Sequence, residues 1–190
     1  LMRDAGCVFM GKTVTTELGH RHPGPTRNPC NLAHTPGGSS SGSAAAVADF
    51  MVPISLGTQT TASVIRPAAF CGVIGYKPTY GDFDKTGVLA NAPSMDSLGI
   101  IARSIEDLCL LRGILLGEQH KIITPNNLSK VRFAQLSASP WEKADDETRH
   151  LIENFMDKIV SKGAKRVDID LEHELKRLME LHRLISGFEF

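Results

Sequence analysis

The chain has 190 residues, of which 42% are hydrophobic and 22% charged, and its 21 Lys and Arg residues balance its 21 Asp and Glu residues. This composition is typical of a globular domain with a buried core, and it excludes disordered, collagen-like and membrane-spanning classes. Because no net field attracts a polyanion or an anionic lipid surface, we expect neither nucleic acid nor a membrane as a partner. Recognition must then depend on a local site.

Four cysteines are spaced too irregularly to form a CxxC motif. Each stands in or beside a run of apolar or small residues, which favours buried free thiols over a disulfide framework. The sequence therefore indicates a reducing compartment, and we expect a cytoplasmic protein. The four residues are Cys7, Cys30, Cys71 and Cys109.

The first part of the chain predicts short buried strands separated by Gly and Pro, at residues 7–11, 51–58 and 72–79. Small residues from Ser43 to Ala48 are compatible with a tightly packed helix. Ser104 followed by Asp107 resembles a capping box, which predicts a helix from this point to Gly117.

The last third predicts a strand at 131–138, an amphipathic helix at 145–163, a strand at 165–171 and a final helix. The alternation indicates an α/β fold, with a layered mixed β-sheet core flanked by helices. We place a motif-rich core at about residues 1–117 and a further α/β segment at 118–190. The chain lacks an initial Met and ends inside a helical pattern, which predicts a fragment of a longer protein.

Residues 37–48, GGSSSGSAAAVA, carry the most information. Gly and Ser alone predict a flexible linker, and this alternative stays open as the minor one. The loop, however, runs directly into a helix of small residues that must be buried. A Gly-rich turn that opens a helix presents unpaired backbone N–H groups, which suit an anion or a developing oxyanion.

Ser63 follows three small residues, Thr60, Thr61 and Ala62, which leave room for a substrate. A serine hydroxyl becomes a nucleophile only when a neighbouring group accepts its proton. None of the seven histidines is accompanied by an evident orienting Asp, and no GxSxG surrounds Ser63. The sequence therefore does not support a Ser-His-Asp triad.

The two segments at 37–48 and 57–72 (GTQTTASVIRPAAFCG) resemble the signature of the amidase signature family, serine hydrolases that cleave carboxamides with a Ser-cisSer-Lys triad. AGCVFMGKTVTTELG, TRNPCNLAHTPGG, GYKPTYG and APSMDSLGIIARSIEDL extend the resemblance to about Leu116, and it continues more loosely beyond. The resemblance implies the amidase signature fold. Residues 1–190 would then form a partial amidase domain whose N- and C-terminal parts are missing.

The resemblance implies that Ser63 is the nucleophile, which forms an acyl-enzyme. It also implies that Ser39, preceded by a cis peptide bond after Gly38, relays the proton of Ser63 to a neutral lysine. The oxyanion hole would be formed by the backbone N–H groups of Thr60, Thr61, Ala62 and Ser63. Neither a metal nor a cofactor is implied.

Other positions are expected to bind the substrate or to support the loops. Arg66 can pair with a substrate carboxylate, or alternatively form an ion pair with an acid such as Asp96. Loop support is expected from Gly37, Gly38, Ser40, Ser41 and Gln59.

The chain departs from the family pattern at two places. The family's lysine falls before Leu1, and neither Lys12 nor Lys77 replaces it by motif, so we expect the fragment by itself to be inactive. Thr61 and Ala62 stand where the family usually has Gly or Ala followed by Gly. The added Cβ atoms favour reduced activity or an altered substrate.

We therefore expect hydrolysis of a small or medium carboxamide to a carboxylate and ammonia. One alternative is the A subunit of a tRNA-dependent amidotransferase, which releases ammonia from glutamine for a partner. The other is a catalytically impaired homologue that binds a carboxylate or another anion. SVIRP, with Gln59 in place of the usual acid, favours a stand-alone bacterial-type amidase. Charge and motif leave the oligomeric state open, a homo-oligomer included.

Overall fold

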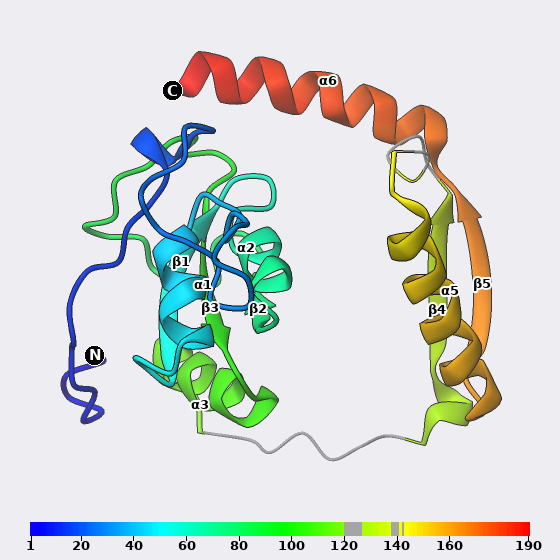
Figure 1. Cartoon of the computed structure of the whole chain (residues 1–190), viewed down its shortest axis with the longest axis horizontal. Helices are drawn as coiled ribbons and strands as arrows, with labels where there is room; N and C mark the ends of the chain where they lie inside the picture. The colour runs from blue at the N-terminus through cyan, green and yellow to red at the C-terminus, as the bar shows by residue number, and fades with distance from the viewer. Residues whose placement is uncertain (120–126, 138–140, 142) are drawn as a thin grey trace. The chain divides into compact units, whose positions relative to one another are not determined.

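The computed structural model describes residues 1–119, 127–137, 141 and 143–190 (Figure 1). It divides into two compact units, one formed by Leu1–Ile123 with Glu189–Phe190 and the other by Thr124–Phe188. Each unit combines strands with helices, which confirms the predicted α/β class. Across the described ranges, no helix is both long enough and apolar enough to cross a lipid bilayer.

A three-stranded antiparallel sheet forms the centre of the first unit, with the strand order β1-β3-β2. Its strands are β1 (Ile54–Gln59), β2 (Ile74–Tyr76) and β3 (Ser97–Ala102). All six residues of β3 are buried. Its register against β1 pairs Ile54 with Ala102 and Gln59 with Ser97. The end of β1 and the start of β3 therefore lie together.

Helices cover both faces of this sheet. They are α1 (Ser41–Ala48), α2 (Ile65–Phe70) and α3 (Ile105–Leu116), and a short 3-10 turn, η1 (Glu17–Gly19), precedes them. The predicted capping of α3 is confirmed, since Ser104 Oγ accepts a hydrogen bond from Asp107 N at 3.1 Å. Gly117 ends the helix with φ 66°, a left-handed conformation that glycine adopts without steric cost.

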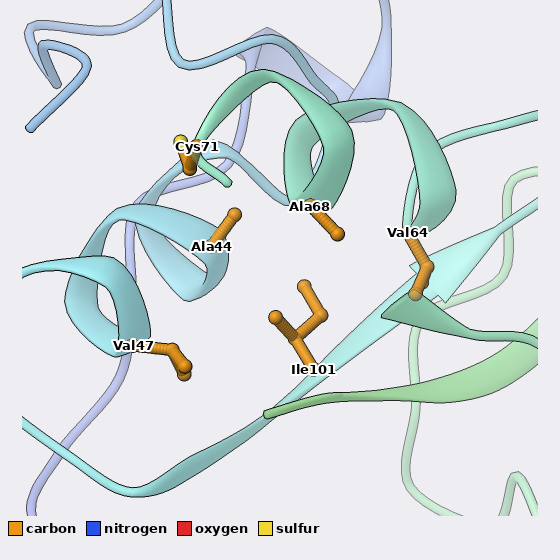
Figure 2. Close-up of a cluster of buried hydrophobic side chains, with 6 residues drawn as sticks. All are labelled: Ala44, Val47, Val64, Ala68, Cys71 and Ile101. Atoms are coloured by element: carbon orange, nitrogen blue, oxygen red, sulfur yellow. The ribbon is translucent and has the colours of Figure 1, made fainter. Parts of the chain in front are cut away.

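Two apolar clusters fill the space between the helices and the sheet. Figure 2 shows Ala44 and Val47 of α1 and Ala68 of α2 pointing toward Ile101 of β3. The side chain of Ile100, the residue before Ile101 in β3, packs instead with Leu108 and Leu111 of α3. Successive strand residues point to opposite faces, so β3 is covered by α1 and α2 on one face and by α3 on the other. The Ala-rich composition of α1 allows this close approach.

The second unit contains the predicted strand-helix-strand arrangement. Its elements are η2 (Leu128–Lys130), β4 (Arg132–Ser137), α5 (Asp146–Ser161), β5 (Lys165–Asp170) and α6 (Glu172–Glu189). The two strands pair in parallel. Asp145 caps α5 by accepting a hydrogen bond from Thr148 N at 2.7 Å. Met156, Ile159 and Ala164 form a small core.

The strand predicted at residues 7–11 does not form. Val8, Phe9 and Met10 are exposed, because no described strand pairs with this segment. An isolated apolar run has no ladder to satisfy its backbone. The strands predicted at 51–58 and 72–79 are confirmed in shortened form as β1 and β2. Ala138, the last residue of the strand predicted at 131–138, lies outside the described residues.

The four cysteines are free thiols, as predicted, but they are not all buried. Cys71 is 2% exposed, whereas Cys30 is exposed and the other two are half-buried. Cys30 Sγ lies 3.4 Å from the carbonyl oxygen of Cys71. Burial raises the pKa of the Cys71 thiol to about 11 from 9.0, and the neighbouring Cys30 adds to the shift.

We expect a water-soluble disulfide reagent at pH 8 to modify Cys30 and to leave Cys71 unreacted in the folded chain. The neutral thiol of Cys71 is favoured by the folded state, so its contribution to stability is complete below pH 9 and is lost as the pH rises toward about 11. Peptide mapping after timed modification measures both rates. Equal rates at Cys30 and Cys71 would contradict the burial described above.

Candidate functional site

The two loops that carry Ser39 and Ser63 lie against each other. Ser40 N donates a hydrogen bond to Ser63 O at 3.1 Å. Gly37 has φ 78°, and a Cβ built on it would lie 3.0 Å from the Cα of Pro67 in α2. Glycine is therefore required at this position both by the backbone conformation and by the close approach of α2.

The peptide bond between Gly38 and Ser39 is cis, as the resemblance implies. Ser39 O accepts hydrogen bonds from Thr16 N at 3.0 Å and from Ser41 N at 2.9 Å. A Cβ on Gly38 would lie 2.7 Å from Thr16 Cγ2. The serine loop is thus held by the segment around Thr16 as well as by the Ser63 loop.

The serine hydroxyls near this junction differ in what they bind. Those of Ser40, Ser41 and Ser43 each donate to a main-chain carbonyl, at 3.2, 3.2 and 2.8 Å respectively. Neither Ser39 Oγ nor Ser63 Oγ hydrogen bonds to any residue that the structure describes, and no hydrogen bond joins the two. Ser39 is 6% exposed and Ser63 is half-buried. These two hydroxyls are the ones left available for chemistry.

The loop that leads to Ser63 has bound carbonyls and available N–H groups. The carbonyls of Thr61, Ala62 and Ser63 accept hydrogen bonds at 3.0, 2.8 and 3.1 Å. In the described part of the chain, the N–H groups of Ala62 and Ser63 donate to no residue. A fixed loop with uncommitted donors is the arrangement needed to stabilise negative charge on a substrate oxygen.

Gln59 holds this loop from the end of β1. Its buried side chain accepts hydrogen bonds from Val64 N at 2.8 Å and Ile65 N at 3.0 Å, and it donates to Thr61 O at 3.0 Å. A carboxylate could accept the first two bonds but could not donate the third. One neutral amide therefore bonds to the backbone on both sides of Ser63.

We expect Gln59→Leu to lower the free energy of unfolding by about 3 kcal/mol or more, because three backbone groups lose their partner and each costs about 1–3 kcal/mol when buried. Gln135→Leu in β4 is the matched control. Gln135 Oε1 is buried and has no hydrogen-bond partner among the described residues. Its replacement should be neutral or stabilising in urea unfolding. Equal losses in the two variants would be inconsistent with the role given to Gln59.

The alternative ion pair between Arg66 and Asp96 is not formed. Asp96 is 5% exposed, and its carboxylate accepts hydrogen bonds from Thr60 Oγ1 and from Asn91 N and Ala92 N. Arg66 is exposed, and its guanidinium forms no ion pair or hydrogen bond with the described residues. It remains available to a substrate carboxylate. No motif in the sequence indicated the contact between Asp96 and Thr60.

Neither Lys12 nor Lys77 hydrogen bonds to Ser39 or Ser63 within the described residues. Lys77 Nζ donates to Pro78 O. Lys12 lines an open groove of about 390 Å³ together with Arg27, Leu32, Met51 and small residues of α1. Neither Ser39 nor Ser63 lines that groove. No described lysine or histidine hydrogen bonds to either serine.

Comparison with known proteins supports the same family as the geometry of this site, namely the cis bond, the two adjacent serine loops and the N–H groups that donate to no described residue. The amidase family's sequence profile matches residues 1–188. The chain belongs to the amidase family. The A subunit of the glutamyl-tRNA(Gln) amidotransferase of Endomicrobium trichonymphae is 36% identical over 191 residues, which cover 90% of this chain and 39% of that relative. The chain thus spans about two fifths of the length of this curated amidase-family relative.

Solved amidase-family structures share the fold. The A subunit of the glutamyl-tRNA(Gln) amidotransferase from Thermotoga maritima superposes with a TM-score of 0.84 at 30% identity, over 99% of this chain and 45% of that one. A peptide amidase from Stenotrophomonas maltophilia gives 0.84 at 30% identity, over 100% of this chain and 44% of that one. Because the two values are equal, the fold does not separate the two activities. The expected closeness to stand-alone amidases stays a prediction.

Proposed function

We propose that the amidase domain containing these residues hydrolyses a carboxamide to a carboxylate and ammonia through an acyl-enzyme on Ser63. The observation that carries the proposal is the distribution of hydroxyl bonds. Serines 40, 41 and 43 are committed to main-chain carbonyls, whereas Ser39 and Ser63 are not. The backbone bond from Ser40 to Ser63 keeps these two loops together.

The proposed reaction has two halves. Ser63 Oγ attacks the amide carbon, and its proton passes through Ser39 to the lysine that the resemblance implies before Leu1. The C–N bond then breaks and the nitrogen leaves as ammonia with the relayed proton. Water adds to the resulting ester, releases the carboxylate and returns the proton to Ser63 Oγ. Since the chain as given does not include that lysine, we propose that these 190 residues alone are inactive.

The loop residues have distinct proposed roles. The backbone N–H groups of Thr60, Thr61, Ala62 and Ser63 form the oxyanion hole, in which single donors are typically worth about 3 kcal/mol. Support for the loops comes from Gly37, Gly38, Ser40, Ser41 and Gln59. Arg66 binds a carboxylate of a small-molecule substrate, because its guanidinium has no counter-ion among the described residues.

A second candidate function is that of the A subunit of an amidotransferase, favoured by the name of the relative from Endomicrobium trichonymphae described above. In that case the amide is glutamine, and the ammonia passes to a partner. Ammonia release by the complete gene product, with simple carboxamides and with glutamine, separates the two. We expect release from simple carboxamides without any partner. Release from glutamine only, with a co-purifying tRNA-binding protein, would favour the amidotransferase. Anion binding without ammonia from any amide would favour the impaired homologue.

A further inference from the structure

Asp96 occupies a position that links β3 to the loop before Ser63. It immediately precedes β3, and the pairing of Gln59 with Ser97 brings it beside Thr60. One carboxylate oxygen accepts hydrogen bonds from Asn91 N at 2.7 Å and Ala92 N at 2.9 Å. The other oxygen accepts the hydroxyl of Thr60.

The surroundings of Asp96 make this contact rigid. A buried carboxylate is costly unless its oxygens are hydrogen bonded, and bonds to a charged acceptor are about twice as strong as neutral ones. The backbone of Asp96 is also fixed, because Lys85 Nζ donates to Asp96 O at 2.7 Å. Lys85 in turn lies over the ring of Tyr80, with 4.4 Å from Nζ to the ring centroid. The hydroxyl of Thr60 therefore binds a carboxylate whose own side chain and backbone are held by hydrogen bonds from other residues.

Thr60 is the first residue of the loop whose N–H groups face the reacting carbonyl in the proposed mechanism. Gln59 fixes the far end of that loop through Thr61 O and Val64 N. The near end is fixed by the side chain of Thr60, which reaches another element of the fold. A loop held at both ends keeps its donors in place when charge develops, and a misplacement of about 1 Å can cost about a hundredfold in rate.

We propose that Asp96 is a positioning residue, which holds the oxyanion loop in its working geometry through the hydroxyl of Thr60. This inference rests on the function proposed above. It predicts that the hydroxyl of Thr60, and not only its backbone N–H, is needed for rapid reaction at Ser63.

The test uses Thr60→Val and Thr60→Ser in the complete gene product. Valine replaces the hydroxyl with a methyl group of similar size and leaves the two backbone bonds of Asp96 in place. Serine keeps the hydroxyl. Asp84→Asn is the matched control, because Asp84 Oδ1 also accepts hydrogen bonds from a threonine, Thr86, through its N–H at 2.9 Å and its hydroxyl at 2.7 Å. Asp84, however, lies in an exposed turn.

The reaction measured is phosphonylation by a fluorophosphonate. The Ser63 O–P bond forms, fluoride leaves with the electron pair of the P–F bond, and the hydroxyl proton passes to the base. We expect Thr60→Val to lower the maximal rate constant about tenfold or more while the inhibition constant is unchanged. Thr60→Ser should restore most of the rate that Thr60→Val loses, and Asp84→Asn should stay within about twofold of the parent.

The result that overturns the inference is a maximal rate constant in Thr60→Val equal to that of the parent, or a loss that Thr60→Ser does not restore. In Thr60→Val the Asp96 carboxylate loses a hydrogen-bond donor. If Thr60→Val lowers the temperature of unfolding, the double variant Thr60→Val with Asp96→Asn removes the charge of that carboxylate. It must show the same loss, and a parental rate there would also overturn the inference. If the unsubstituted protein takes up no label, the proposed function itself fails.

Discussion

Ser39→Ala, made in the complete gene product, is expected to lower the rate of amide hydrolysis by about a thousandfold and to leave the free energy of unfolding nearly unchanged. The hydroxyl of Ser39 forms no hydrogen bond to the described residues, so its removal breaks no structural bond. In the proposed mechanism it passes the proton of Ser63, and proton transfer by a positioned group contributes about 10² to 10⁴ in rate. Steady-state ammonia release and urea unfolding measure the two effects.

The control is Ser41→Ala, two residues further along the chain at the start of α1. Ser41 Oγ donates to Val14 O at 3.2 Å, and the residue is buried. Loss of this bond should cost about 1 kcal/mol of stability, and the rate of the folded enzyme should change little. The two variants therefore have opposite profiles. If Ser41→Ala loses as much activity as Ser39→Ala, the separation of structural from catalytic serines is wrong.

Gly42→Ala should destabilise the first unit by about 3 kcal/mol, although alanine is the better helix former by about 1 kcal/mol. A Cβ on Gly42 would lie 2.5 Å from Val14 N and 2.8 Å from Val14 O. Both atoms belong to the backbone, and Gly42 N already donates to Val14 O at 2.8 Å. To relieve this overlap, α1 must move away from Val14, which breaks the hydrogen bond from Gly42 N to Val14 O.

Gly187→Ala in α6 is the matched control for this substitution. Apart from its two chain neighbours and the nearby backbone of α6, no atom of the described residues lies within 4 Å of a Cβ built on Gly187. Only the gain in helix propensity remains, and we expect stabilisation by up to about 1 kcal/mol. Urea unfolding of both variants measures the difference. A stabilising Gly42→Ala would show that the close packing of α1 on Val14 does not exist in solution.

Elements with local signals could be predicted from the sequence. Ser104 and Gly117 mark both ends of α3, and the strand-helix-strand pattern of the last third matches β4, α5 and β5. The strand predicted at 7–11 failed because an apolar run forms a strand only with a partner. Conversely, β3 was not predicted as an element. Its pairing with β1 and β2 depends on residues distant in sequence, which no local period shows.

In the candidate site, too, some features could be predicted from the sequence and others could not. Ser39 and Ser63 could be selected from the two motifs, and Gln59 was expected beside them. The three bonds of the Gln59 amide and the commitment of the Ser40 and Ser41 hydroxyls are visible only in three dimensions. Asp96 was considered only as a partner for Arg66. Its real partner follows from the register of β3 against β1, which sequence reasoning did not include.

The most direct test of the Ser63 acyl-enzyme is to locate the label of a fluorophosphonate on the complete gene product. Ser39 and Ser63 fall on one tryptic peptide, because no Lys or Arg lies between Arg27 and Arg66, so fragment-ion mass spectrometry must assign the site. We predict one label per chain, on Ser63, and none in Ser63→Ala. Absence of label, or label on Ser39, Ser40 or Ser41, would contradict the assignment of Ser63 as the nucleophile.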